Sequence, residues 1–134
     1  MPVVEQLNIF LENRPGQLRA FCDALRDGAV NMRALLLPDG REAGVARLVV
    51  DDAEEAIQVL KRAKILAIRS PALAVEVGNH PGALGELAER LARGGVEIQY
   101  AYGSGTGERA VLVLGVSDLD AADRLLGADN GARR

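Results

Sequence analysis

The sequence predicts an α+β protein made of two copies of one small module. The pattern Asn-x-Pro-Gly-x-Leu occurs at residues 13–18 and again at residues 79–84, an offset of 66 residues. Each copy follows a run of alternating apolar residues and precedes a segment with helical apolar spacing, so each marks a junction from strand to helix. Strands and helices that are apolar on one face only are expected to pack as helices over one side of an antiparallel sheet.

In the first copy, a strand is predicted over residues 3–11, where apolar side chains alternate. A helix follows and ends at Gly28, and its inward face is predicted from the spacing i, i+3, i+4, i+7. That face consists of Leu18, Phe21, Cys22 and Leu25. Two further strands, residues 30–37 and 45–50, are joined through a turn at Pro38-Asp39-Gly40.

A second helix comes next, and Asp51 and Asp52 can cap its N-terminus with their side-chain oxygens. Its predicted inward face consists of Ala53, Ala56, Ile57 and Leu60. A fourth strand over residues 64–69 ends the copy at Ser70-Pro71. The order strand, helix, strand, strand, helix, strand is that of a ferredoxin-like module.

The same order begins again at Leu73 without a gap, which indicates a true internal repeat. The shared residues occupy core positions, turn glycines and helix caps. They pair Leu7 with Leu73, Leu25 with Leu91, Gly28 with Gly94, Val30 with Val96, Val50 with Val116, Asp52 with Asp118, and Leu60 with Leu126. We therefore expect two modules, residues 1–70 and 71–134. No apolar run follows Leu126, so the second module is predicted to lack its last strand, and the tail from Gly127 to be poorly ordered.

Composition excludes several classes of function. The chain has 134 residues and a net charge of −3, without the basic stripe that nucleic-acid or anionic-membrane binding requires. No apolar stretch is long enough to span a membrane and no secretory leader is evident, so we expect a cytoplasmic protein. The single cysteine, Cys22, excludes an intrachain disulfide and a cysteine-cluster metal site. No nucleophile, base and orienting group cluster in the sequence, so neither enzyme activity nor a cofactor is expected.

The two Pro-Gly sequences are the candidate binding sites. Pro15 and Pro81 are predicted at the first helical position, where the missing N–H of proline costs nothing. Gly16 and Gly82 remove a side chain from the place where the N–H groups of the first helical turn point outward.

This arrangement suits a zwitterionic amino acid. The backbone N–H groups of residues 16–18 can donate to its carboxylate, assisted by the helix dipole. The side-chain oxygens of Asn13 and Asn31 can accept from its ammonium group.

Residues 9–18, together with Gly28-Ala29-Val30-Asn31-Met32, resemble the opening of an ACT domain, a small ligand-binding module that regulates amino-acid metabolism. Residues 78–98 are a second copy of the same pattern. The tandem arrangement without a catalytic domain is similar to free-standing, two-module ACT proteins that bind amino acids. The resemblance thus implies two ACT-like modules.

The first copy locally resembles the serine-inhibited dehydrogenase of serine biosynthesis, in which two asparagines hold the amino acid between two modules. The resemblance places these roles on Asn13 and Asn31, and on Asn79 in the second copy. Glu97 stands where the fourth asparagine would be, and a carboxylate can still accept from a ligand ammonium group.

The expected function is that of a non-catalytic regulatory protein that binds a free amino acid at interfaces between ACT modules. The alternative is a dimerisation or interaction module that acts as the regulatory subunit of an amino-acid biosynthetic enzyme. The candidate ligand-binding residues are Asn13, Arg14, Pro15, Gly16, Gln17, Leu18 and Asn31 in the first module and Asn79, His80, Gly82, Ala83, Leu84 and Glu97 in the second. No catalytic or metal-binding residue is expected.

Several of these residues also have a purely structural interpretation. Asn13 and Asn79 can be turn residues that bond their own backbone two residues on. His80 can be an exposed residue beside a helix start, and Cys22 lies on an apolar helix stripe, where it is expected to pack.

Two other features of the second copy are assigned to structure. Tyr100 and Tyr102 alternate on one strand face, which favours packing in a core or an interface. The glycine-rich residues 103–107 join two strands and open no helix, so we interpret them as a flexible hairpin loop and not as a phosphate-binding loop.

A symmetric homodimer is expected from the missing last strand. Without that strand, the segment Leu73 to Val77 would expose unpaired N–H and C=O groups at a sheet edge. Such an edge is a template for pairing with a second copy of the chain, with ligand pockets formed between modules.

Overall fold

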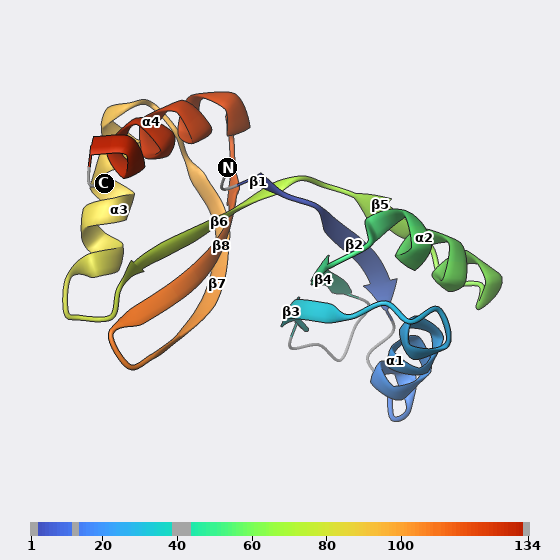
Figure 1. The fold of residues 1–134 in the computed structure, drawn as a ribbon. Coiled ribbons are helices and arrows are strands. Elements are labelled where there is room, and N and C mark those ends of the chain that lie inside the picture. Colours follow the sequence, from blue (N-terminus) through green and yellow to red (C-terminus); the bar gives the residue numbers. More distant parts are fainter. Residues whose placement is uncertain (1–2, 12–13, 39–43, 133–134) are drawn as a thin grey trace. The chain divides into compact units, whose positions relative to one another are not determined.

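The computed structural model describes residues 3–11, 14–38 and 44–132, with side chains up to residue 127 (Figure 1). It contains two compact units, and each has a four-stranded antiparallel sheet and a hydrophobic core of its own. We call residues 5–71 the first module, and residues 3–4 together with the chain from Ala72 onward the second module. The predicted α+β class with two ferredoxin-like modules is confirmed.

The first module has its strands in the order β3-β4-β2-β5 and its two helices on one face of the sheet (Figure 1). Alternation along β2 buries Leu7 and Ile9, which form the core together with Phe21 of α1 and Leu60 of α2. The elements are β2 (Gln6–Leu11), α1 (Gln17–Asp27), β3 (Met32–Leu36), β4 (Gly44–Val50), α2 (Ala53–Arg62) and β5 (Ala67–Arg69).

The second module repeats this plan with the order β1-β6-β8-β7. Its core contains Leu73 of β6, Leu87 and Leu91 of α3, and Leu126 of α4. The elements are β1 (Val3–Val4), β6 (Ala72–Gly78), α3 (Ala83–Arg93), β7 (Ile98–Thr106), β8 (Arg109–Val116) and α4 (Leu119–Ala132).

The first predicted strand is in fact two strands that belong to different sheets. It is interrupted at Glu5, and Val3 and Val4 pair antiparallel with Leu73 and Ala72 in the second module. The sheet edge that was predicted to be open along Leu73 to Val77 is therefore covered at its start. Apolar alternation alone could not reveal this, because it does not specify the partner of a strand.

No described strand follows α4, as predicted, but the tail is helical and not irregular. α4 continues through Gly127 as far as Ala132, although glycine is a poor helix former. Its start is capped by Asp118, which accepts from the Ala121 N–H at 3.0 Å, as Asp52 caps α2 by accepting from the Glu55 N–H at 3.1 Å. The capping role predicted for Asp52 is confirmed.

Two predicted strands begin later than expected, β3 at Met32 and β5 at Ala67. The N–H groups of Val30 and Ile65 donate to carbonyl oxygens in the last turns of α1 and α2, at 2.9 and 2.8 Å. These residues therefore complete the helix ends and cannot start a strand.

The predicted inward face of α1 is only partly correct. Phe21 and Leu25 are buried and Cys22 is half-buried, but Leu18 remains 41% exposed. Ile57 of α2 is likewise half-buried. Leu18 lies in the first turn of its helix, beyond the end of the core, and becomes part of a surface hollow described below.

Candidate functional site

Each Pro-Gly sequence forms a tight turn in front of its helix. The Gln17 N–H donates to the Arg14 carbonyl oxygen at 3.1 Å, and Gly16 has φ 89° and ψ −12°. Proline followed by a left-handed glycine defines a type II turn. The helix begins at Gln17, so the prediction that Pro15 is its first residue is wrong. A Cβ at this position would meet nothing within 4 Å, so lack of space does not explain the glycine. Glycine is required here because of the positive φ.

The second turn has the same geometry. The Ala83 N–H donates to the His80 carbonyl oxygen at 3.2 Å, and Gly82 has φ 89° and ψ −10°. α3 begins at Ala83, so the prediction that Pro81 is the first helical residue is also wrong.

The N–H groups of the turn and the first helical turn only partly match the donors predicted at residues 16–18. The Gln17 N–H is used by the turn, and the Ala20 N–H donates to the Gly16 carbonyl oxygen at 3.0 Å. The N–H groups of Leu18 and Arg19 have no backbone acceptor within the described parts of the chain. Unpaired N–H groups are typical of the first turn of a helix.

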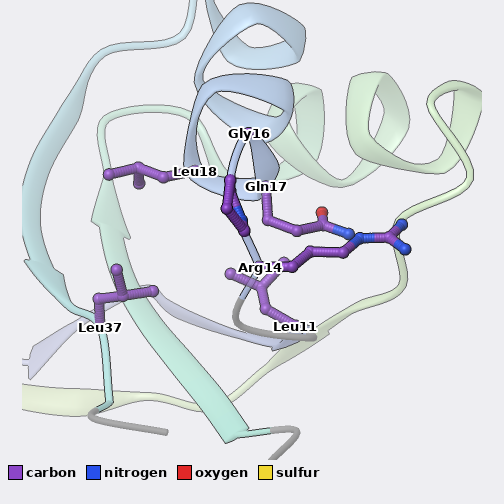
Figure 2. Close-up of a pocket in the computed structure, with 7 residues that line it drawn as sticks. Leu11, Arg14, Gly16, Gln17, Leu18 and Leu37 are labelled. Carbon is purple, nitrogen blue, oxygen red and sulfur yellow. The ribbon is translucent and has the colours of Figure 1, made fainter. Parts of the chain in front are cut away.

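A hollow of about 410 Å³ lies beside the first turn. In Figure 2, Leu18 and Leu37 lie on the same side of the turn, Leu18 from α1 and Leu37 from the segment after β3. The remaining lining residues are Leu11, Arg14, Pro15, Gly16 and Gln17. The hollow therefore has an apolar wall, and its size falls in the range of small-molecule sites.

Polar groups gather on the other side of the turn. In Figure 2 the side chains of Arg14 and Gln17 run side by side, away from Leu18 and Leu37. With the Gln17 amide oriented to satisfy both groups, its oxygen accepts from Nε and Nη2 of Arg14 at 3.0 and 3.1 Å. A second hollow of about 390 Å³ is lined here by residues 14–17 and Ala20. The turn thus has an apolar hollow and a polar one beside it.

The two asparagines of the first motif are not brought together within their own module. Asn13 lies outside the described residues. Asn31 precedes β3 at the end of the sheet where Met32 pairs with Val50, whereas the turn follows the opposite end, where Leu11 pairs with Gly44. These ends are separated by the seven residues of β4, which is roughly 20 Å.

The backbone of Asn31 holds the loop before β3 in place. Its N–H donates to Asp51 Oδ1 at 3.0 Å, and its carbonyl oxygen accepts from the Asp51 N–H at 3.2 Å. Glu97 and Ser117 form the same pair of contacts in the second module, both at 2.9 Å. The side chains of Asn31 and Glu97 are exposed.

Asn79 is bonded to a hairpin in the second module. Its side-chain amide donates to the Gly107 carbonyl oxygen at 2.9 Å, and its backbone N–H donates to the Glu108 carbonyl oxygen at 2.9 Å. A Cβ at Gly105 would lie 2.9 Å from Asn79 Oδ1, so a side chain there would displace the Asn79 amide. Asn79 therefore has a structural role. Its partners, Gly107 and Glu108, are distant in sequence, whereas the turn interpretation had expected a bond to its own backbone two residues on.

This hairpin corrects the interpretation of the glycine-rich run. Residues 98–106 are all in β7, and only Gly107 and Glu108 form the turn to β8. Tyr100 lies against Gly115 of the neighbouring strand, where a Cβ would collide with its ring. Of the glycines interpreted as a flexible loop, Gly103 and Gly105 are thus strand positions with close neighbours, whereas Gly107 lies in the turn with a positive φ.

The remaining candidates of the second module lie near its turn. His80 is exposed, and its Nδ1 is 3.0 Å from the Pro81 carbonyl oxygen. Ala83 is buried at the start of α3, whereas Leu84 is 49% exposed. These are the same helical positions as Gln17 and Leu18 in the first module.

Leu11 and Leu37 are the residues of the hollow that sequence reasoning did not select. Leu11 was predicted as the last residue of a strand; it is buried and also reaches the hollow. Leu37 was assigned to the end of a strand and is 37% exposed. The sequence signal for Leu37 is that the second copy has glycine, at position 103, where the first copy has leucine.

Other kinds of site find no support in the described residues. No group of three or more His, Cys, Asp or Glu side chains is placed to hold a metal ion among them. None of their helices combines the length and the apolar character that crossing a membrane requires.

Fold and turns together define a tandem ferredoxin-like protein in which each module carries the same glycine-dependent turn in front of its first helix. Residues 2–129 match the family model of the ACT domain pair, and the chain belongs to that family. The resemblance seen in the sequence is therefore confirmed. No curated protein matches the chain.

Solved structures extend this comparison. Protein BT0572 from Bacteroides thetaiotaomicron is 29% identical, with a TM-score of 0.90 over 96% of this chain and 90% of that one. The regulatory subunit of aspartate kinase from Thermus thermophilus, in a ligand-free form, is 16% identical, with a TM-score of 0.73 over 100% of this chain and 95% of that one. The corresponding subunit from Thermus flavus is 16% identical, with a TM-score of 0.68 and 96% of each chain covered. The two subunits share the fold.

Proposed function

We propose that this ACT domain pair is a non-catalytic regulatory protein that binds a free amino acid at the turn of its first module. The observation that carries the proposal is the hollow of about 410 Å³ beside a glycine-dependent helix start. Such a site offers an apolar wall for a side chain and unpaired N–H groups for a carboxylate.

The charged groups of an amino acid would contact different parts of the site. Its carboxylate would accept from the N–H groups of Leu18 and Arg19 and from Arg14. Its ammonium group would need oxygen acceptors, for which Asn13 is the first candidate. Because Asn31 lies at the far end of its own sheet, it would contribute only to a ligand bound by another ACT module, as expected for a site at a module interface. We propose a homodimer as the source of that module, and the cytoplasm as the place of action.

Two of the structural relatives are regulatory subunits of an aspartate kinase, which supports a regulatory role. By analogy, the target of regulation here would be an enzyme of amino-acid metabolism.

A thermal-shift screen of the twenty amino acids tests the proposal. An amino acid present at 100 times its dissociation constant should stabilise the folded chain by roughly 2.7 kcal/mol. A melting temperature that no amino acid raises would reject amino-acid binding.

The alternative function is docking on a partner enzyme without a ligand. The observation that favours it is the sheet face of the first module that its helices do not cover, where Phe10 is 58% and Ile68 is 47% exposed. Exposed apolar groups on a sheet face are typical of interaction surfaces. A flat amino-acid screen, together with weaker association with such an enzyme after Phe10→Asp, would favour docking.

A further inference from the structure

The internal repeat offers a comparison between two turns with the same backbone and different side chains. Leu37, which forms part of the apolar wall in the first module, corresponds to Gly103 in the second. A Cβ at Gly103 would collide with the Val111 carbonyl oxygen and lie 2.9 Å from Leu112 Cα. No side chain fits at that position, so the second module has no counterpart of Leu37 beside Leu84.

The polar side of the turn differs as well. Arg14 and Gln17, which contact each other in the first module, correspond to His80 and Ala83. The second module therefore retains the turn but lacks a counterpart of Leu37 and of the Arg14 guanidinium group. Asn79 is committed to the β7–β8 hairpin through the Gly107 carbonyl oxygen.

The side chains of the first hollow indicate the class of ligand. The three leucines Leu11, Leu18 and Leu37 form its apolar wall together with Pro15. No described lining residue carries a hydroxyl or a carboxylate. A ligand hydroxyl, carboxylate or ammonium group placed against these leucines would lose its hydrogen bonds to water without a replacement. An aliphatic group placed there gains by leaving water.

We propose that the first turn selects a free amino acid with an aliphatic side chain, at one site per chain. The aliphatic group contacts Leu11, Leu18 and Leu37, and the carboxylate lies toward Arg14. This inference rests on the proposed amino-acid binding and adds the ligand class and the stoichiometry to it.

Calorimetric titration of the full chain tests the proposal with leucine, isoleucine, valine and methionine against serine, aspartate and lysine. An aliphatic amino acid should bind at one site per chain, and at least about tenfold more tightly than serine, which is the scale of selectivity of apolar pockets. Tighter binding of serine, aspartate or lysine would overturn the ligand class while leaving the proposed function intact. Absence of heat with every amino acid, together with an unchanged melting temperature, would overturn both.

Matched variants locate the site. Leu18→Asn and Leu37→Asn should each weaken binding of the aliphatic amino acid by about tenfold or more. Both side chains are more than a third exposed, so the variants should fold, which circular dichroism checks. Leu84→Asn is the control, because Leu84 has the same helical position in the second module and is 49% exposed. An equal loss of affinity in Leu84→Asn, or two equivalent sites per chain, would overturn the assignment to the first turn.

Discussion

Val3 lies opposite Leu73 in the sheet of the second module, just as Arg69 lies opposite Leu7 in the sheet of the first. Each edge strand leads directly into a central strand of the other module, β1 into β2 and β5 into β6. No described strand follows α4. In the second module β1 takes the edge position that β5, the strand after α2, takes in the first.

Deleting residues 1–4 should therefore destabilise the second module, although these residues precede the first module in the sequence. Val3 packs against the second core, and its strand pairs with β6. The loss of this packing and pairing should cost about 1–3 kcal/mol. Urea unfolding measures it, and Val111→Ala at a 51% exposed position serves as a control that should change little. Equal stability of the truncated chain would show that β1 contributes nothing to the sheet.

Asn79→Ala should loosen the β7–β8 hairpin. The variant loses the side-chain hydrogen bond to the Gly107 carbonyl oxygen, with an expected cost of about 0.5–1.5 kcal/mol. Hydrogen exchange of residues 105–109 should become faster, while affinity for the ligand of the first turn stays the same. If affinity falls and exchange does not change, Asn79 is a ligand-binding residue, as the resemblance to the dehydrogenase implies.

Gly16→Ala and Gly82→Ala form a matched pair. Both glycines have φ 89° and open space where a Cβ would lie, so each substitution should cost about 1–2 kcal/mol from backbone strain alone. Only Gly16→Ala should also reduce amino-acid affinity in a titration. Similar affinity losses in the two variants would mean that both turns bind ligand.

Asn31→Ala and Glu97→Ala test the contribution of the second asparagine. Their loops are held by backbone contacts to Asp51 and Ser117, so both variants should keep the stability of the parent chain. If Asn31 contacts the ammonium group of a ligand, its removal should cost about 1.5–3 kcal/mol of binding free energy. Unchanged affinity in Asn31→Ala would remove it from the site.

The assembly is tested by light scattering at micromolar concentration. We expect the mass of a homodimer, although the edge that first motivated it is covered by β1 at Ala72 and Leu73. A monomer mass with intact amino-acid binding would show that one chain completes its own site.

The parts of the fold that depend on local pattern could be predicted from the sequence. The alternation along β2, the capping role of Asp52 and the equivalence of the two copies are all found in the structure. The predictions were wrong where one local sequence pattern is compatible with two backbone structures. Proline beside glycine can start a helix or form a type II turn before it, and the positive φ of Gly16 decided in favour of the turn.

By itself the sequence determined the repeat, the fold class and the position of the two turns, because periodicity and turn chemistry act over a few residues. Only the tertiary structure decided that Val3 pairs with Leu73, that Asn79 holds a hairpin and that Leu18 and Leu37 line one hollow. These contacts join residues 19 to 70 positions apart in the chain. Their formation depends on how strands pair and on where the core ends, and no short segment specifies either.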